Sequence, residues 1–286
     1  MAEANDRVLR GMTNEGGFRV ITARTTDTVR AAVAAQGATG IVAQRFGELL
    51  TAAVLYRETM APQLRVQAIL QGATGGQLVA DSNPDGSARG LVRLPKAKDD
   101  ITLAGGQLHM MRTMPRGDVH KGVVEVPKDT QGAPVSAALM SYLQTSEQVV
   151  SMMSVGCRIV DGEVTHAGGY ILQLLPELEE NLLMLMTERL EDFRSMEDLF
   201  DGIADSPEHL LSELLYGIPY TTLDDSEVRF ACTCSQVRVM ASLGTLGRAD
   251  IEDLMSDGTP LEMNCDYCGT EYNVSPEQLR GMLDPT

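Results

Sequence analysis

The 286-residue sequence contains no tryptophan, seven tyrosines and five phenylalanines. It also has no apolar run near the length of about 18 residues that crosses a bilayer. Positive charge is scarce, because 23 Lys/Arg oppose 40 Asp/Glu and give a formal net charge of −17. Nucleic-acid and anionic membrane surfaces both need a basic patch, so the sequence argues against either partner. The acidic start, residues 1–7, has no apolar leader segment, and we therefore expect a cytoplasmic protein.

What is present is typical of a soluble folded protein, with 43% hydrophobic and 22% charged residues. The charge is unevenly distributed. Residues 1–175 contain 17 Lys/Arg and 16 Asp/Glu, residues 176–220 contain 2 and 12, and residues 221–286 contain 4 and 12. This pattern predicts a neutral main domain over 1–175, an acidic amphipathic helical linker over 176–227, and a small domain over 228–286.

Hydrophobic periodicity predicts an α+β fold for the main domain. Alternation and turn residues predict strands at 18–24, 64–71, 76–81, 88–94, 107–112, 122–126, 149–160 and 163–174. Helical spacing predicts helices at 27–36, 41–60 and 134–145, with Thr26 as the cap of the first and Gly37 after its end. Helices grouped with hairpins, rather than strict strand–helix alternation, favour antiparallel sheets.

The linker has the pattern of amphipathic helices. Pro176 is a plausible helix start, and an apolar stripe follows it at Leu178, Leu182, Met186, Leu190 and Phe193. A second helix is predicted at 207–216. Such helices are marginal alone and hold only while docked. We interpret the acidic runs 177–180 and 224–227 as solvated helix faces, and Met184, Met186 and Met196 as candidate contacts for a partner protein.

Four of the five cysteines lie in the last 55 residues, as Cys232-Thr-Cys234 and Cys265-Asp-Tyr-Cys268. Four thiolates suit a closed tetrahedral zinc site, and without an export signal they are better read as metal ligands than as structural disulfides. A structural zinc supplies on the order of 10–16 kcal/mol of folding free energy. Whole domains are stable by about 5–15 kcal/mol, so oxidation of these thiolates should unfold the small domain.

Further motifs accompany these pairs. They are Arg89-Gly90, Tyr142-Leu-Gln-Thr-Ser146-Glu147-Gln148, Ala167-Gly168-Gly169-Tyr170-Ile-Leu-Gln173-Leu-Leu-Pro176, Phe230-Ala-Cys232-Thr-Cys234-Ser235 and Cys265-Asp-Tyr-Cys268-Gly-Thr-Glu-Tyr272. Together, and over nearly the whole chain, they resemble the bacterial redox-regulated heat-shock holdases, the thirty-three-kilodalton heat-shock chaperone family. The segment 107–120 departs from the family pattern.

The resemblance implies an ATP-independent chaperone, not an enzyme, that is inactive while reduced and bound to one zinc per chain. It also implies that oxidation forms the disulfides Cys232–Cys234 and Cys265–Cys268. Zinc is then released, the C-terminal region unfolds, the linker joins a surface for unfolding client proteins, and activated chains form homodimers.

Other features have plainer interpretations. Cys157 is expected to be a buried, inert thiol, and the four histidines lack metal-ligand spacing. The glycine-rich segment 72–76 lacks the ending of a phosphate-binding loop and is expected to be a hairpin turn. Two alternatives remain: a zinc-ribbon interaction module, against which the acidic charge argues, and a thiol–disulfide oxidoreductase using Cys265 and Cys268.

Overall fold

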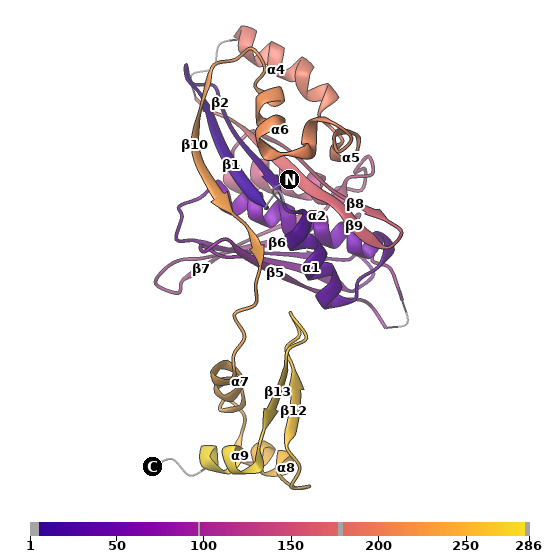
Figure 1. Ribbon diagram of the computed structural model, residues 1–286, viewed down its shortest axis with the longest axis vertical. Coiled ribbons are helices and arrows are strands. Elements are labelled where there is room, and N and C mark those ends of the chain that lie inside the picture. Colours follow the sequence, from indigo (N-terminus) through magenta and orange to yellow (C-terminus); the bar gives the residue numbers. More distant parts are fainter. Residues whose placement is uncertain (1–5, 97, 177–179, 284–286) are drawn as a thin grey trace, which may run out of the picture. The chain divides into compact units, whose positions relative to one another are not determined.

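The computed structural model describes residues 6–96, 98–176 and 180–283 (Figure 1). The chain divides after Ala231 into two compact units. Glu177, Leu178 and Glu179, which follow the predicted helix start at Pro176, lie outside the described residues. No helix within these ranges combines the length and the apolar character that crossing a bilayer requires.

The first unit contains two sheets. One has the order β10-β1-β2-β9-β8 and is antiparallel throughout. Its strands are β1 Arg7–Thr13, β2 Phe18–Arg24, β8 Ser151–Val160, β9 Glu163–Leu174 and β10 Tyr220–Glu227. The other sheet has the order β11-β5-β4-β3-β6-β7, antiparallel except between β11 and β5. Its strands are β3 Arg65–Gln71, β4 Gln77–Ser82, β5 Ser87–Arg93, β6 Gln107–Thr113, β7 Val119–Glu125 and β11 Arg229–Phe230. The predicted α+β fold is confirmed.

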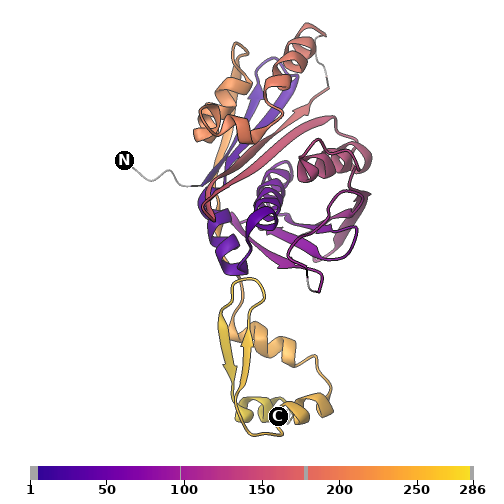
Figure 2. The same cartoon turned by 90° about the vertical axis from the view of Figure 1, so that its right-hand side faces the viewer.

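Helix α2, Gly40–Glu58, lies between the two sheets (Figure 2). Fifteen of its 19 residues are buried, because apolar residues occur on all of its faces and each sheet covers one side. Helices α1, Thr26–Gln36, and α3, Pro134–Tyr142, complete this core.

The ends of the helices differ in part from the sequence-based prediction. Thr26 is the first residue of α1 and not its cap, because Thr25 occupies the cap position, where its hydroxyl bonds the Thr51 hydroxyl at 2.6 Å. Gly37 does end the helix, with the left-handed φ of 59° that glycine tolerates. Beyond α3, residues 143–147 form a π-helical turn that the sequence analysis did not predict.

The linker packs on the five-stranded sheet, on the face opposite α2 (Figure 1). Its helices are α4 Glu180–Asp192, α5 Met196–Leu199 and α6 Pro207–Leu214. Alternate residues of each strand serve the two faces: Ile21 faces the α2 core, whereas Val20 packs in the cluster with the linker. The inner strands β2 and β9 of this sheet are therefore buried on both sides.

Two further segments, 224–227 and 72–76, can be compared with the structure predicted for them. Residues 224–227 do not form a helix face. They belong to strand β10, where Asp224 and Asp225 pair with Arg10 and Arg7 of β1. The glycine-rich segment is a hairpin turn between β3 and β4, as predicted, and the Gly72 amide donates to the Gly76 carbonyl at 3.1 Å.

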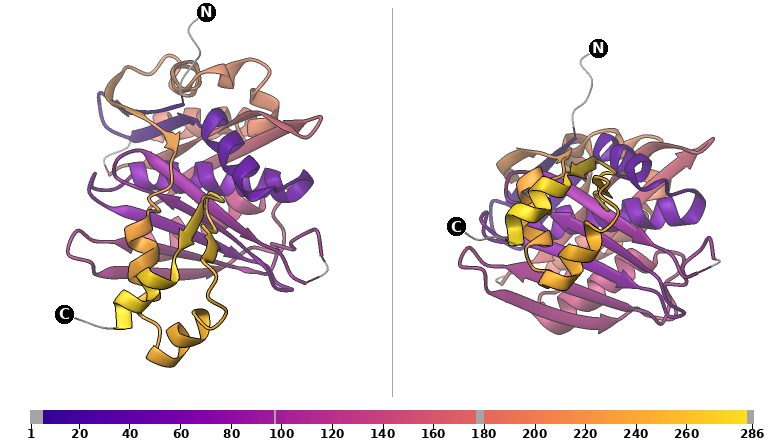
Figure 3. Two further views of the ribbon diagram at one scale, coloured as in Figure 1. Left: turned by 60° about the horizontal axis from the view of Figure 1, so that its bottom comes forward. Right: turned by 90° about the horizontal axis from the view of Figure 1, so that it is seen from below.

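The second unit is small (Figure 3). Its elements are α7 Gln236–Leu243, α8 Arg248–Leu254, β12 Leu261–Asn264, β13 Glu271–Val274 and α9 Pro276–Leu283. Among its described residues only four apolar side chains are buried: Leu243, Ile251, Val274 and Leu279. A core of this size does not stabilise a domain without an additional cross-link, such as a disulfide or a bound metal.

Glu48 of α2 predicts a pH dependence of stability. Burial raises the pKa of this carboxyl to about 7, although Arg45 opposes the shift with a contact of 2.8 Å. As the pH rises, Glu48 ionises at a lower pH in the unfolded chain than in the folded protein. The free energy of unfolding should therefore fall by about 3 kcal/mol between pH 4.5 and pH 7 and level off above. Glu48→Gln should remove this part of the slope in denaturant titrations, whereas Glu163→Gln, at an exposed site, should not. Equal slopes for Glu48→Gln and wild type would contradict the assignment.

Candidate metal centre

The first cysteine pair lies in the segment that leads into α7. Ser235 caps this helix, since its hydroxyl accepts a hydrogen bond from the Arg238 amide at 3.3 Å. The Arg238 guanidinium also donates to the Thr233 hydroxyl, between Cys232 and Cys234, at 2.6 Å. Both contacts fix the backbone that presents the two thiols.

The second pair lies in the turn between β12 and β13. The Cys265 amide donates to the Thr270 carbonyl at 2.9 Å, and the Gly269 amide donates to the Cys265 carbonyl at 2.8 Å. Gly269 has a φ of 71°, which explains glycine at this position. The turn therefore directs the thiols of Cys265 and Cys268 to the same side.

The four thiol sulfurs converge. All four Sγ atoms lie within 4.8 Å of one another. The Sγ atoms of Cys232 and Cys265 are 3.7 Å apart, and those of Cys234 and Cys268 are 3.4 Å apart. Zinc–sulfur bonds of about 2.3 Å in a tetrahedron place neighbouring sulfurs about 3.8 Å apart. The cluster thus fits a metal ion held by four thiolates, and zinc is the metal that such a donor set favours.

The thiols differ in acidity. Burial raises the pKa of Cys234 to about 12. At Cys268 burial acts in the same direction, but hydrogen bonds from the Thr270 hydroxyl and amide and from the neighbouring thiols outweigh it, so its pKa is lowered to about 7. Near neutral pH, Cys268 is therefore the first of these two thiols to become a thiolate, the form that binds metal and reacts with oxidants.

Cys157 lies in β8 of the first unit and is fully buried, as predicted. Burial, with the nearby carboxylates of Glu48 and Glu197, raises the pKa of this thiol well above its ordinary value. It therefore remains protonated near neutral pH. Cys157 is also separate from the cluster formed by the other four cysteines.

Polar contacts attach the linker to the five-stranded sheet. Four side chains of the sheet donate hydrogen bonds to linker carbonyls: Thr22 to Pro207 at 2.8 Å, Ser154 to Arg194 at 2.9 Å, Tyr170 to Phe193 at 2.9 Å, and Arg158 to Glu197. These donors could not be predicted from the sequence, because a Thr, Ser, Tyr or Arg in a strand has no distinguishing signal for such a contact. Only Tyr170 stands in one of the quoted motifs.

The apolar side of the linker is largely covered. Met186 and Met196, two of the three candidate partner contacts, are 1% and 2% exposed within the cluster on the sheet. Met184 is 60% exposed on α4 and stands outside that cluster. The docked linker therefore hides apolar surface that its release would uncover.

These features define a class: an α+β protein whose linker packs on its own sheet, followed by a small unit with four clustered thiols that could hold a metal ion. The chain belongs to the Hsp33 protein family, whose model matches residues 6–275. The resemblance noted in the sequence is thus confirmed.

Curated relatives extend over the same length. The 33 kDa chaperonin of Syntrophotalea carbinolica is 28% identical, with 97% of this chain and 99% of the relative covered. That of Bacillus subtilis is 27% identical, with 98% and 99% covered. The crystal structure of the 33 kDa chaperonin (heat shock protein 33 homolog) of Thermotoga maritima aligns with a TM-score of 0.84 over 98% of both chains, at 21% identity. The last comparison supports the fold.

Proposed function

We propose that this chain is a cytoplasmic, redox-regulated and ATP-independent holdase chaperone, inactive while reduced and bound to one zinc ion. The observation that carries the proposal is the four-thiol cluster, within 4.8 Å, in a unit with so small a buried core. The relatives named 33 kDa chaperonin support a chaperone and not an enzyme.

The metal would be held by Cys232, Cys234, Cys265 and Cys268, and it would supply the cross-link that the small core lacks. Oxidation removes these ligands. In each cysteine pair two thiols lose two electrons and two protons to one peroxide molecule, which leaves as two waters, and one S–S bond forms. We propose the pairs Cys232–Cys234 and Cys265–Cys268, because the two thiols of each pair are near neighbours in the chain and can meet once the segment has unfolded.

Loss of the second unit's structure is proposed to destabilise the docked linker, which precedes it in the chain. Release would uncover the apolar cluster shared by the sheet and the linker, including Met186 and Met196. Such a surface suits unfolding client proteins of varied sequence, because methionine adapts its shape. The acidic charge of residues 176–227 would keep it soluble. We further propose that activated chains associate as homodimers.

The direct test compares redox states of the purified protein. Reduced protein should hold one zinc per chain and leave an aggregating client unprotected. Peroxide with mild heat should release the zinc and suppress aggregation, measured by light scattering. Equal suppression in the presence of dithiothreitol would contradict the redox switch. Efficient insulin reduction by the zinc-loaded protein would instead favour a thiol–disulfide oxidoreductase.

A further inference from the structure

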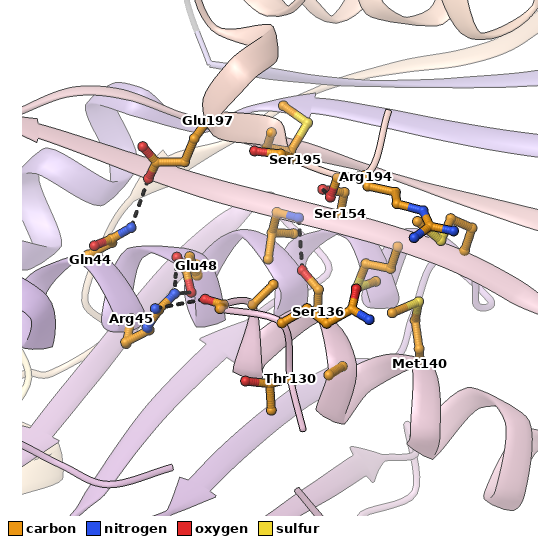
Figure 4. Close-up of a pocket in the computed structure, with 18 residues that line it drawn as sticks. Gln44, Arg45, Glu48, Thr130, Ser136, Met140, Ser154, Arg194, Ser195 and Glu197 are labelled. Carbon is orange, nitrogen blue, oxygen red and sulfur yellow. Dashed lines mark hydrogen bonds and ion pairs between the residues drawn. The ribbon is translucent and has the colours of Figure 1, made fainter. Parts of the chain in front are cut away.

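A cavity of about 440 Å³ lies within the first unit, between the linker and the rest of that unit (Figure 4). Its walls come from α2, from α3 and the segment before it, from β8, and from linker residues 194–197. Figure 4 shows Glu48 and Arg45 on the α2 side and Met140 on the α3 side. The proposed function gives this cavity no role.

Methionine is unusually frequent in the cavity wall. Four of its lining residues are methionines, contributed by three different segments: Met140, Met152, Met153 and Met196. Met140 and Met152 are partly exposed, so a small solute reaches this part of the wall, whereas Met196 is 2% exposed. Thioether sulfur is the side-chain group besides thiol that mild oxidants attack.

The position of Met196 connects this wall to linker docking. Met196 is the first residue of α5 and belongs to the apolar cluster between linker and sheet, against which Met152 also packs. Hydrogen bonds hold the linker on both sides of it, from Ser154 to the Arg194 carbonyl at 2.9 Å and from Gln44 to the Glu197 carboxylate at 2.8 Å. A new polar oxygen here would lie within the apolar contact that holds the linker on the sheet.

We propose that Met140, Met152 and Met196 form a second oxidation site, at which conversion of the partly exposed Met140 and Met152 to methionine sulfoxide weakens linker docking at Met196 independently of the cysteines. The proposal rests on the proposed function, whose regulation it extends. In each step the thioether sulfur takes one oxygen atom from hydrogen peroxide, the O–O bond breaks, and water leaves. The sulfur is oxidised by two electrons and the peroxide is reduced. The sulfoxide oxygen requires hydrogen bonds that an apolar contact does not provide.

The test exploits the different reversibility of the two oxidations. Full-length protein is treated with peroxide and then with dithiothreitol and zinc, which restore the thiols and the metal but leave sulfoxides in place. Mass spectrometry should find oxygen added at one or more of the three methionines. Trypsin should then cleave residues 180–231 about tenfold faster than in untreated protein, since cleavage follows the open population. Methionine sulfoxide reductases should abolish the difference.

Variants separate this site from the other methionines. After peroxide treatment and restoration of the thiols, the triple variant Met140→Leu/Met152→Leu/Met196→Leu should be cleaved at the rate of untreated protein. If this variant folds poorly, Met152→Leu alone should show a smaller increase in cleavage than wild type. Met184→Leu, at an exposed position outside the cavity, should respond as wild type does.

The proposal is overturned if wild type shows no sulfoxide at these positions, or if it returns to untreated cleavage while carrying one. Absence of chaperone activity before the thiols are restored would contradict the proposed function instead, and linker cleavage would still report on the methionine site.

Discussion

Replacing Cys265 with serine is expected to abolish tight zinc binding and to open residues 176–286 to protease. The hydroxyl is a poor ligand at neutral pH, so one of four thiolates is lost. Structural zinc contributes on the order of 10–16 kcal/mol, against a total domain stability of about 5–15 kcal/mol. With four buried apolar side chains in the described part of the second unit, little else keeps it folded.

Zinc release to a chromogenic chelator and limited proteolysis would measure both effects. We expect zinc affinity to fall by more than about 100-fold, beyond the loss that changes outside the ligand shell cause. Cys157→Ala is the matched control, because it removes a thiol that lies outside the cluster. It should keep its zinc. A Cys265→Ser protein that stayed zinc-loaded and protected would refute the ligand assignment.

The cysteine centre could be predicted from sequence because its signal is local. Two closely spaced pairs specify the ligand set, and the Gly269 turn that presents the second pair follows directly in the chain. The strand at 18–24 was equally accessible, because the alternation of apolar and polar residues that predicts it is contained within a few consecutive positions.

Elements that depend on distant partners could not be predicted from the sequence. Strand β10 has mostly exposed side chains and no hydrophobic period, so its acidic residues suggested a helix face. It is a strand because β1, more than 200 residues earlier, offers Arg10 opposite Asp224 and Arg7 in a diagonal ion pair with Asp225. The donors that hold the linker, such as Thr22, likewise acquire their role only through tertiary contacts.

Gly156→Val is expected to activate the chaperone without any oxidation. Gly156 of β8 faces the linker, and a Cβ atom there would lie 2.8 Å from Met196 Cβ and 3.0 Å from Phe200 Cε2. Because the first of these atoms lies next to the helix backbone, α5 as a whole would have to move. Overpacking of this kind costs about 1–3 kcal/mol, enough to shift a marginal docking equilibrium by about 5- to 150-fold.

The zinc centre should remain loaded in this variant, because Gly156 belongs to the first unit and the four ligands to the second. Reduced Gly156→Val protein should therefore bind one zinc, lose protection of residues 180–231 and suppress client aggregation in dithiothreitol. Ser151→Val places the same side chain at a half-exposed site on the same strand and should stay inactive. If zinc-loaded Gly156→Val were open at the linker yet inactive, the docked linker would not be what keeps the chaperone silent. The inhibitory contact would then have to be sought in the second unit.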